Sequence, residues 1–232
     1  MLTPKKKITK REIKQDKLVE SYFKFKTFYE EYQKQLLIGI GSFVLIVLLV
    51  IYLVNRSKEA EQIASTELGL VMPIYDQNLY QQAIDGNPQK KIKGLRYIVD
   101  EYGSTDAGED AKIFLANSYF NLGKIDEALE LYEDYSGSNK IFRATANAGA
   151  AACYEIKNNH EKAIEHYLKA AKLINSEAFT PTYLLNAAKL YAQNGKKDQA
   201  KKILDQIKKE YENAQPARDY ERYLSEFGIE KD

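Results

Sequence analysis

The longest apolar run in the chain lies between residues 36 and 54. It reads LLIGIGSFVLIVLLVIYLV, without a charged residue, and only Ser42 and Tyr52 carry a polar side-chain atom. As a helix it would measure roughly 28 Å at about 1.5 Å per residue, close to the ~30 Å hydrocarbon core of a bilayer. A buried core helix seldom runs this far without a polar face, so the pattern predicts a transmembrane helix at 36–54.

The segment before this run places apolar and aromatic residues at intervals of four and three, which indicates one face of a helix. Residues 1–8 are basic and predicted to be disordered, and Thr9 with Glu12 fits a capping box that would start the helix. Lysines border the face, so the helix could rest on anionic lipid, or dock onto another membrane complex or a second copy of the chain. The face comprises Leu18, Tyr22, Phe25, Tyr29, Tyr32 and Leu36, with Phe23 and Phe28 beside it.

Charge is divided unevenly on the two sides of the apolar run. Residues 1–35 hold ten Lys or Arg and five Asp or Glu, whereas residues 55–232 hold twenty-four and twenty-eight. The positive-inside rule therefore predicts a cytoplasmic N-terminus and a C-terminal domain across the membrane. A charged leader of this length, with no small-x-small site after Val54, favours an uncleaved anchor. The C-terminal part has no basic face that would indicate nucleic-acid binding.

A helical pattern with a period near 35 residues follows the anchor. Small residues recur at Gly94, Ala128, Ala163 and Ala200. Tyrosines recur at Tyr119, Tyr154 and Tyr191, each preceded by an alanine three residues earlier and followed four residues later by Gly123, Asn158 or Gly195. This layout resembles the tetratricopeptide repeat family, and the resemblance implies an all-α solenoid of helical hairpins.

The residue types of the repeat have physical reasons. The alanine before each tyrosine allows close approach of two helices, and Gly or Asn tolerates the left-handed conformation that ends a helix. A single hairpin cannot bury its own apolar face, so the hairpins must stack. We expect helix pairs at 106–121 with 125–136, 140–156 with 161–174, and 181–193 with 197–211, after an irregular pair at 60–84 with 89–102.

Several helix ends can also be predicted. Pro73 should kink or break the first helix, and Asp85 stands where the repeat would have a tyrosine. Asn87 and Thr180 are predicted N-caps because each precedes a proline at a first helical position. A last helix from Pro216 to about Phe227 should form a polar cap, with Arg218, Asp219, Glu221 and Arg222 toward solvent.

These patterns divide the chain into four predicted parts. They are a basic amphipathic leader at 1–35, the transmembrane helix at 36–54, a stalk with an irregular first helix region at 55–88, and the repeat solenoid with its capping helix at 89–232.

The combined arrangement is similar to a narrower group, the single-pass tetratricopeptide proteins of the bacterial inner membrane, typified by the ancillary, periplasm-facing subunit of the Sec translocon. This resemblance, carried by architecture and generic repeat residues, implies protein–protein interaction at the inner membrane with a periplasmic C-terminal domain. The implied partners are Sec translocon subunits, secreted clients and periplasmic chaperones. A structural scaffold for cell-envelope or division machinery is the alternative, and an enzyme accessory or peptidase-like protein is a third.

The family's geometry implies a concave groove lined by the first helix of each pair. A merely solvated groove remains the competing interpretation. The carboxylate-clamp subgroup is a poor match, because Ile113 stands where its first lysine would be, Gly149 replaces its second-repeat asparagine, and only Asn117 matches. Capture of a C-terminal carboxylate is therefore not predicted. The implied groove residues are Ile113, Asn117, Phe120, Thr145, Ala148, Ala152, Leu185 and Lys189.

No residue pattern predicts catalysis, a metal or a cofactor. His160 and His166 are six residues apart, unlike helical metal pairs at four, and are expected to face solvent. Cys153 lies among alanines and is predicted to be a small core residue. Adjacent carboxylates such as Glu109 and Asp110 point to different parts of a helix surface. An enzyme is therefore not predicted.

Overall fold

The computed structural model describes the backbone of residues 10–230 and the side chains of residues 17–230. It divides into two compact units, Met1–Arg56 and Ser57–Asp232, which meet within a long helix, α1 (Lys10–Asp76). The predicted disorder at 1–8 and the predicted cap at Thr9 lie outside the described residues. The helix is unbroken at both ends of the apolar run, so residues 36–54 are part of a longer element.

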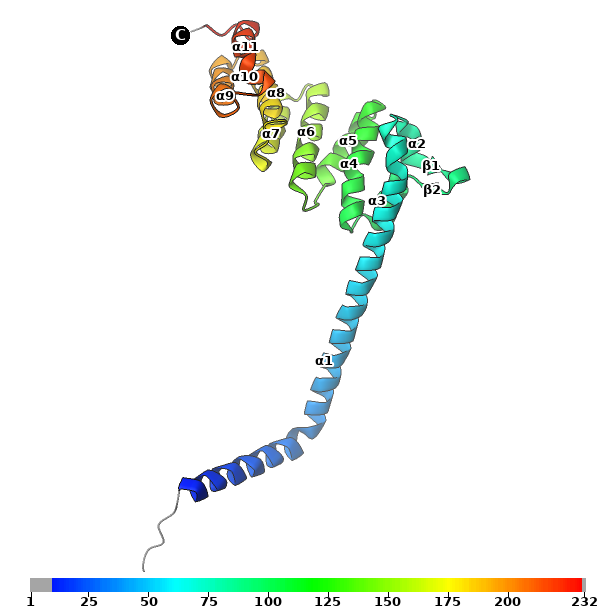
Figure 1. Cartoon of the computed structure of the whole chain (residues 1–232), viewed down its shortest axis with the longest axis vertical. Helices are drawn as coiled ribbons and strands as arrows, with labels where there is room; N and C mark the ends of the chain where they lie inside the picture. Colours follow the sequence, from blue (N-terminus) through cyan, green and yellow to red (C-terminus); the bar gives the residue numbers. More distant parts are fainter. Residues whose placement is uncertain (1–9, 231–232) are drawn as a thin grey trace, which may run out of the picture. The chain divides into compact units, whose positions relative to one another are not determined.

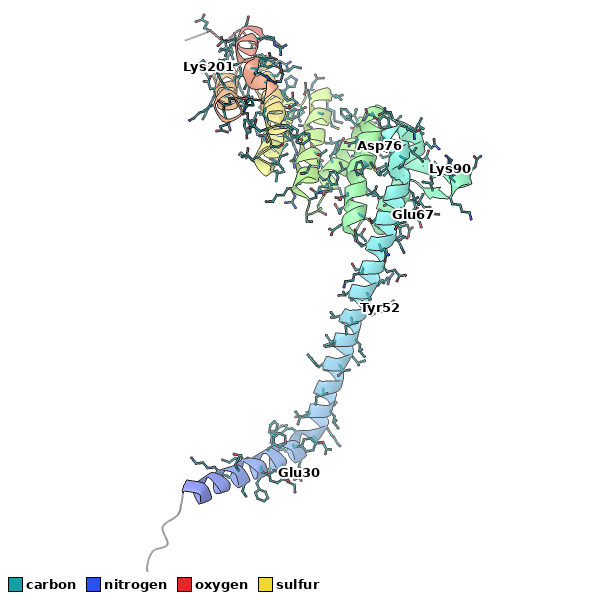
Figure 2. All side chains as sticks on the ribbon, viewed as in Figure 1. Glu30, Tyr52, Glu67, Asp76, Lys90 and Lys201 are labelled. Atoms are coloured by element: carbon teal, nitrogen blue, oxygen red, sulfur yellow. The ribbon has the colours of Figure 1, made fainter. Side chains whose placement is uncertain are left out.

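The apolar run in the first unit exposes its side chains. Ile38 is 69% exposed and Leu45 is 68% exposed, and Tyr52 also faces outward. Within the described residues α1 is the one helix that is long and apolar enough to cross a membrane, which is a statement about length and composition. The helix axis changes direction beyond Glu30 in Figure 2.

The first helix of each of the four repeats ends with the same hydrogen-bond motif, which also ends α11 (Tyr220–Glu226) at Gly228. At the end of α1, Leu79 N donates to Ile74 O at 3.3 Å and Asn78 N donates to Tyr75 O at 2.8 Å, with Asn78 at a φ of 59°. This pair of bonds satisfies carbonyl groups that the last helical turn leaves free. The same motif with positive φ closes α4 (Asp106–Asn121), α6 (Lys140–Ile156) and α8 (Thr180–Gln193) at Gly123, Asn158 and Gly195, which confirms those three predicted caps.

The motif at Asn78 corrects the prediction for the first repeat. The expected helix at 60–84 passes through Pro73 and ends at Asp76, and a separate helix α2 (Tyr80–Asp85) follows. Ile74 therefore occupies the position where the other repeats have a tyrosine. The sequence pattern places that position at Asp85, which is wrong.

Ala83 follows Asn78 by five residues, as Ala128 follows Gly123, and it is fully buried. Helix α2 therefore begins the second helix of the first repeat, and residues 86–94 interrupt that helix before α3 (Leu95–Tyr102), so Gly94 precedes a helix and does not hold the periodic alanine position.

The interrupting segment forms a small projecting hairpin (Figure 1). Strand β1 (Gly86–Asn87) pairs antiparallel with β2 (Ile92–Lys93), and a 3₁₀ turn η1 (Pro88–Lys90) joins them. Asn87 is a cap as predicted, since its Oδ1 accepts from Lys90 N at 3.1 Å, but it caps this turn. Helix α3 (Leu95–Tyr102) begins after the hairpin, not at residue 89.

The regular repeats agree with their predicted helix pairs to within two residues at every end. Helices α4, α6 and α8 each pair with the helix that follows them in the chain. The second helices are α5 (Ile125–Asp134), α7 (His160–Leu173) and α9 (Lys197–Glu210). The periodic alanines lie between helices with no exposed surface, as their predicted role requires: Ala116, Ala128, Ala151, Ala163, Ala188 and Ala200.

The C-terminal cap differs from its prediction. The expected helix at 216–227 is two short helices, α10 (Gln215–Arg218) and α11 (Tyr220–Glu226), separated at Asp219. Tyr220 and Leu224 are buried in the core shared with α9, while Glu221 and Arg222 are exposed.

The predicted cap at Thr180 is also wrong. Its hydroxyl accepts from Ser176 N at 3.0 Å and donates to Ile174 O at 2.8 Å, so the buried side chain holds the preceding loop instead of capping α8.

The apolar core of the second unit consists of three successive clusters. The first joins the end of α1 to α2, α3 and α4, the second joins α4, α5 and α6, and the third runs from α6 to α11. Each cluster is built from elements close in sequence, as expected for a solenoid in which every repeat contacts only its neighbours.

Gly149 offers a test of how closely these helices pack. A Cβ at Gly149 would lie 2.4 Å from Cζ of Tyr132, a buried ring held between α5 and α6. We expect Gly149→Ala to lower the free energy of unfolding by about 1–3 kcal/mol, because the ring must shift in a filled core. Urea denaturation of the full-length protein, followed by circular dichroism, measures the change.

Gly69→Ala is the matched control. Gly69 also lies inside a helix, but a Cβ there would meet nothing within 4 Å. Alanine should therefore stabilise the helix by up to about 1 kcal/mol. Equal effects of the two substitutions would contradict the close contact at Tyr132.

Candidate partner-binding surface

All eight residues implied for the groove lie on α4, α6 and α8, and seven of them are at least partly exposed, on the side of these helices that we call the helix-A face. Ile113 is an exception and corrects the prediction, because it is only 1% exposed and packs in the second core cluster. It points toward α5 and α6, where a repeat needs an apolar side chain between its helices. Ile113 is therefore unavailable to a partner.

Asn117 joins three helices through its side-chain amide. Tyr132 Oη on α5 donates to Asn117 Oδ1 at 2.6 Å, and Asn117 Nδ2 donates to Tyr75 Oη at 3.2 Å. Burial raises the pKa of Tyr75, although the hydrogen bond with Asn117 opposes the shift, and burial also raises the pKa of Tyr132. Both tyrosines remain protonated at neutral pH. Asn117 is thus already bound within the repeat stack.

Four aromatic rings extend this contact along the first three repeats. Tyr75 lies edge-on to Tyr80 at 5.7 Å and to Phe114 at 5.2 Å, and Phe114 lies edge-on to Phe142 at 5.6 Å. All four rings are half-buried. The sequence analysis missed them because they lie beside the periodic positions, although Phe114 precedes Asn117 by one helical turn.

The remaining groove residues are distributed over the same three helices. Phe120 packs against the second core cluster, and Ala148 and Leu185 pack against the third. Thr145 Oγ1 donates to Ile141 O at 3.0 Å. Ala152 is half-buried, and Lys189 is exposed beside α11, where it lines a hollow with Glu226 and Phe227. The face is mixed in polarity, with small residues on α6.

The leader face is exposed along the first unit. Leu18 is 64% exposed, Tyr22 is 62% exposed and Phe25 is 68% exposed, and Tyr29 and Tyr32 are also exposed. Two of the lysines form ion pairs one helical turn away, Lys24 with Glu20 at 2.7 Å and Lys26 with Glu30 at 3.8 Å. The described part of this unit supplies no other element that covers the aromatic side chains.

The two histidines and the cysteine contact or pack against other residues of the repeat stack. His166 is half-buried against Tyr154 at 5.5 Å, which corrects the expected solvent position, and burial lowers its pKa. His160 begins α7, with Nδ1 2.8 Å from Asn194 Oδ1. Cys153 is fully buried as predicted, and burial raises the pKa of its thiol to about 11, so it is not a thiolate at neutral pH. Among residues 17–230, no group of three His, Cys, Asp or Glu side chains could hold a metal ion.

A charged network ties the ends of α4 and α5 together. Lys112 Nζ donates to Glu109 at 2.8 Å and to Asp134 at 2.6 Å, and Glu109 also accepts from Ser136 N at 2.9 Å. Burial would raise the pKa of Glu109, but the bonds to Lys112 and Ser136 outweigh it and lower that pKa. Asp110 accepts a hydrogen bond from the hydroxyl of Tyr135 at 3.3 Å, so the two neighbouring carboxylates have different partners.

The fold and this surface define a helical-repeat scaffold with side chains committed to packing and hydrogen bonding. Comparison with known families identifies tetratricopeptide repeats at residues 110–139, 144–177 and 183–214. Such repeats are typical of protein–protein interaction modules.

One solved structure supports the fold. It is a kinesin light chain of Podosopora anserina with nearly identical tetratricopeptide-like repeats, and it is similar with a TM-score of 0.54 and 16% sequence identity. The match covers 70% of this chain and 83% of that one. Comparison with curated proteins finds no match.

The charged network predicts a pH dependence. Because the pKa of Glu109 is lowered in the folded state, its carboxylate stabilises the protein above the ordinary glutamate pKa, and this contribution disappears as the pH falls through the folded value. Glu109→Gln should therefore lower the free energy of unfolding by about 1–3 kcal/mol at pH 7. Urea denaturation at pH 7 and pH 3.5 should show the difference from wild type shrinking at the lower pH.

The exposed Glu212 provides a control for this measurement. Glu212→Gln should change the unfolding free energy little at either pH. An effect of Glu109→Gln that does not change with pH would show that altered side-chain packing, and not the loss of the negative charge, lowers the stability.

Proposed function

We propose that this protein is a membrane-anchored interaction module, with residues 36–54 spanning the bilayer. The observation that carries the proposal is the contrast between the two units. Apolar side chains of the run are exposed from Leu37 to Val54, whereas the second unit buries its apolar residues in three clusters. Exposed apolar surface of this extent is favourable in lipid and unfavourable in water.

The proposed orientation has the leader in the cytoplasm and the repeats on the other side of the membrane. The excess of lysine and arginine before residue 36 supports this orientation. We propose that the leader lies on anionic lipid, because its exposed aromatic side chains suit the interface and its lysines suit phosphate. Docking of the same face onto another membrane protein is the alternative.

The proposed role is accessory to protein secretion or envelope protein biogenesis at the bacterial inner membrane. The architecture supports it, since a tethered repeat domain concentrates a binding surface near the site where exported chains emerge. The helix-A face offers half-buried aromatic rings, small residues on α6 and an exposed Lys189, which suits a segment of a client or chaperone. The proposed partners are Sec translocon subunits, secreted clients and periplasmic chaperones.

Orientation can be tested with a single reactive cysteine. In a Cys153→Ala background, Glu212→Cys should react with a membrane-impermeant maleimide added to intact spheroplasts, because this position is exposed on the repeat domain. Thr27→Cys, exposed on the leader, should react only after the membrane is permeabilised. Gel mobility of the labelled protein measures both reactions.

The reverse labelling pattern would place the repeats in the cytoplasm and remove the secretion role. Labelling of both positions in intact spheroplasts would show that residues 36–54 do not separate two compartments. A lysed sample in which both positions react controls for buried cysteines.

Site-specific photo-crosslinking tests the helix-A face. A photoreactive residue at Ala152 or Lys189 should form adducts with exported chains, Sec subunits or periplasmic chaperones in living cells. The same residue at Lys172, exposed on the second helix of a repeat, should form at least several-fold less adduct. Mass spectrometry of the adducts identifies the partners.

Adducts with division or wall-assembly proteins at Ala152 and Lys189 would favour the scaffold alternative over secretion. Equal adduct yields at Lys172 and at the helix-A positions would show that this face is solvated and does not recognise partners.

A further inference from the structure

Two surfaces of opposite charge lie on either side of α3. The basic hairpin, residues 86–93, carries Lys90, Lys91 and Lys93, all exposed. The acidic hollow between α3, α4 and α5 carries Asp100, Glu127 and Glu130 around the apolar side chains of Val99 and Leu131. The hairpin is the inserted part of the first repeat, and Figure 2 shows Lys90 on its projecting portion.

Four of these charged side chains have no ion-pair partner among the described residues. Lys90, Lys91, Glu127 and Glu130 form no ion pair among residues 17–230, and Lys93 lies over the ring of Tyr97 at 4.6 Å.

The hollow also contains the cation Arg96, which interacts with Asp100 and donates to Tyr119 Oη at 3.0 Å, and Asp134, which pairs with Lys112. Glu127 and Glu130 therefore carry the unpaired negative charge of the hollow. Both surfaces therefore keep charge available for a partner.

The hairpin is held in a defined conformation. The close approach of Gly86 to the backbone of Ile92 and Gly94 leaves no room for a Cβ, and Lys91 adopts a φ of 55°. Asn87 closes the turn by accepting from Lys90 N. A preorganised element loses little conformational entropy when it docks.

We propose that two copies of this chain associate through the α3 edge, with the basic hairpin of each copy entering the acidic hollow of the other. The two surfaces share α3, since Tyr97 lines the hairpin side and Asp100 lines the hollow. A patch with a basic half and an acidic half is complementary to itself after a twofold rotation, which is the requirement for a closed dimer. The dimer does not depend on the function proposed above.

Charge reversal in the full-length protein tests this dimer. Lys90→Glu with Lys91→Glu makes the hairpin acidic, and Glu127→Lys with Glu130→Lys makes the hollow basic. Each double variant alone should dimerise at least about tenfold more weakly than wild type, because like charges then face each other across the interface. Light scattering of the detergent-solubilised protein, corrected for detergent mass, gives the oligomeric state.

Mixing the two double variants separates charge complementarity from misfolding. An acidic hairpin then meets a basic hollow in one half of the dimer, and a basic hairpin meets an acidic hollow in the other. The mixture should form dimers again, and differently tagged copies should co-purify. Raising the salt from 0.15 M to 1 M should weaken the wild-type dimer several-fold, since the screening length shortens from about 8 Å to about 3 Å.

Matched charge changes on other helices serve as controls. Lys172→Glu with Lys209→Glu, and Glu177→Lys with Glu212→Lys, reverse exposed charges away from α3 and should leave dimerisation unchanged. A monomeric wild type would overturn the proposal. Persistent dimers in both α3-edge variants would assign the interface to another surface, such as the leader or the apolar run. Assemblies larger than dimers in the mixture would replace the twofold contact with a head-to-tail one.

Discussion

The second unit depends on one constraint, which is that a single helical hairpin exposes too much apolar surface to be stable alone. Each repeat therefore contributes half of a cluster that its neighbour completes, as in the cluster shared by α4, α5 and α6. The alanines at helix crossings make this sharing close, and the cap residues with positive φ stop each first helix at the same point. Stability is thus distributed along the stack.

Polar contacts in this stack are mostly structural, which narrows where recognition can occur. Asn117 holds tyrosines from α1 and α5, and Lys112 holds carboxylates from α4 and α5. A partner could use these groups only by breaking existing bonds, at a cost in desolvation. We therefore propose that partners of the repeat domain use the exposed parts of the helix-A face, the basic hairpin or the acidic hollow.

Much of the fold could be predicted from the sequence, because the repeat period is carried by residues that packing and helix ends require. Ala116, Tyr119 and Gly123 indicate one helix, its buried face and its end together. The first repeat could not be predicted in this way, since Asn78 and Ile74 replace the usual residues and an insertion disrupts the spacing. The placement of Ile113 was wrong because family geometry gives only the approximate face of a helix, and its burial depends on α6. The predicted N-cap at Thr180 was wrong for a similar reason, because its hydroxyl binds the backbone of the preceding loop.

The ending of α1 at Asp76 has a consequence for how the chain is assembled. Residues 61–76 of this helix supply Ala64, Val71 and Ile74 to the first core cluster, against Leu95 and Ile98 of α3. The element that contains the apolar run also shields the open end of the solenoid, so no separate N-terminal capping repeat is needed there. A proteolytic cut after Asp76 would release a fragment with this end uncovered, prone to aggregate, whereas a cut near Ser57 would release a self-sufficient one.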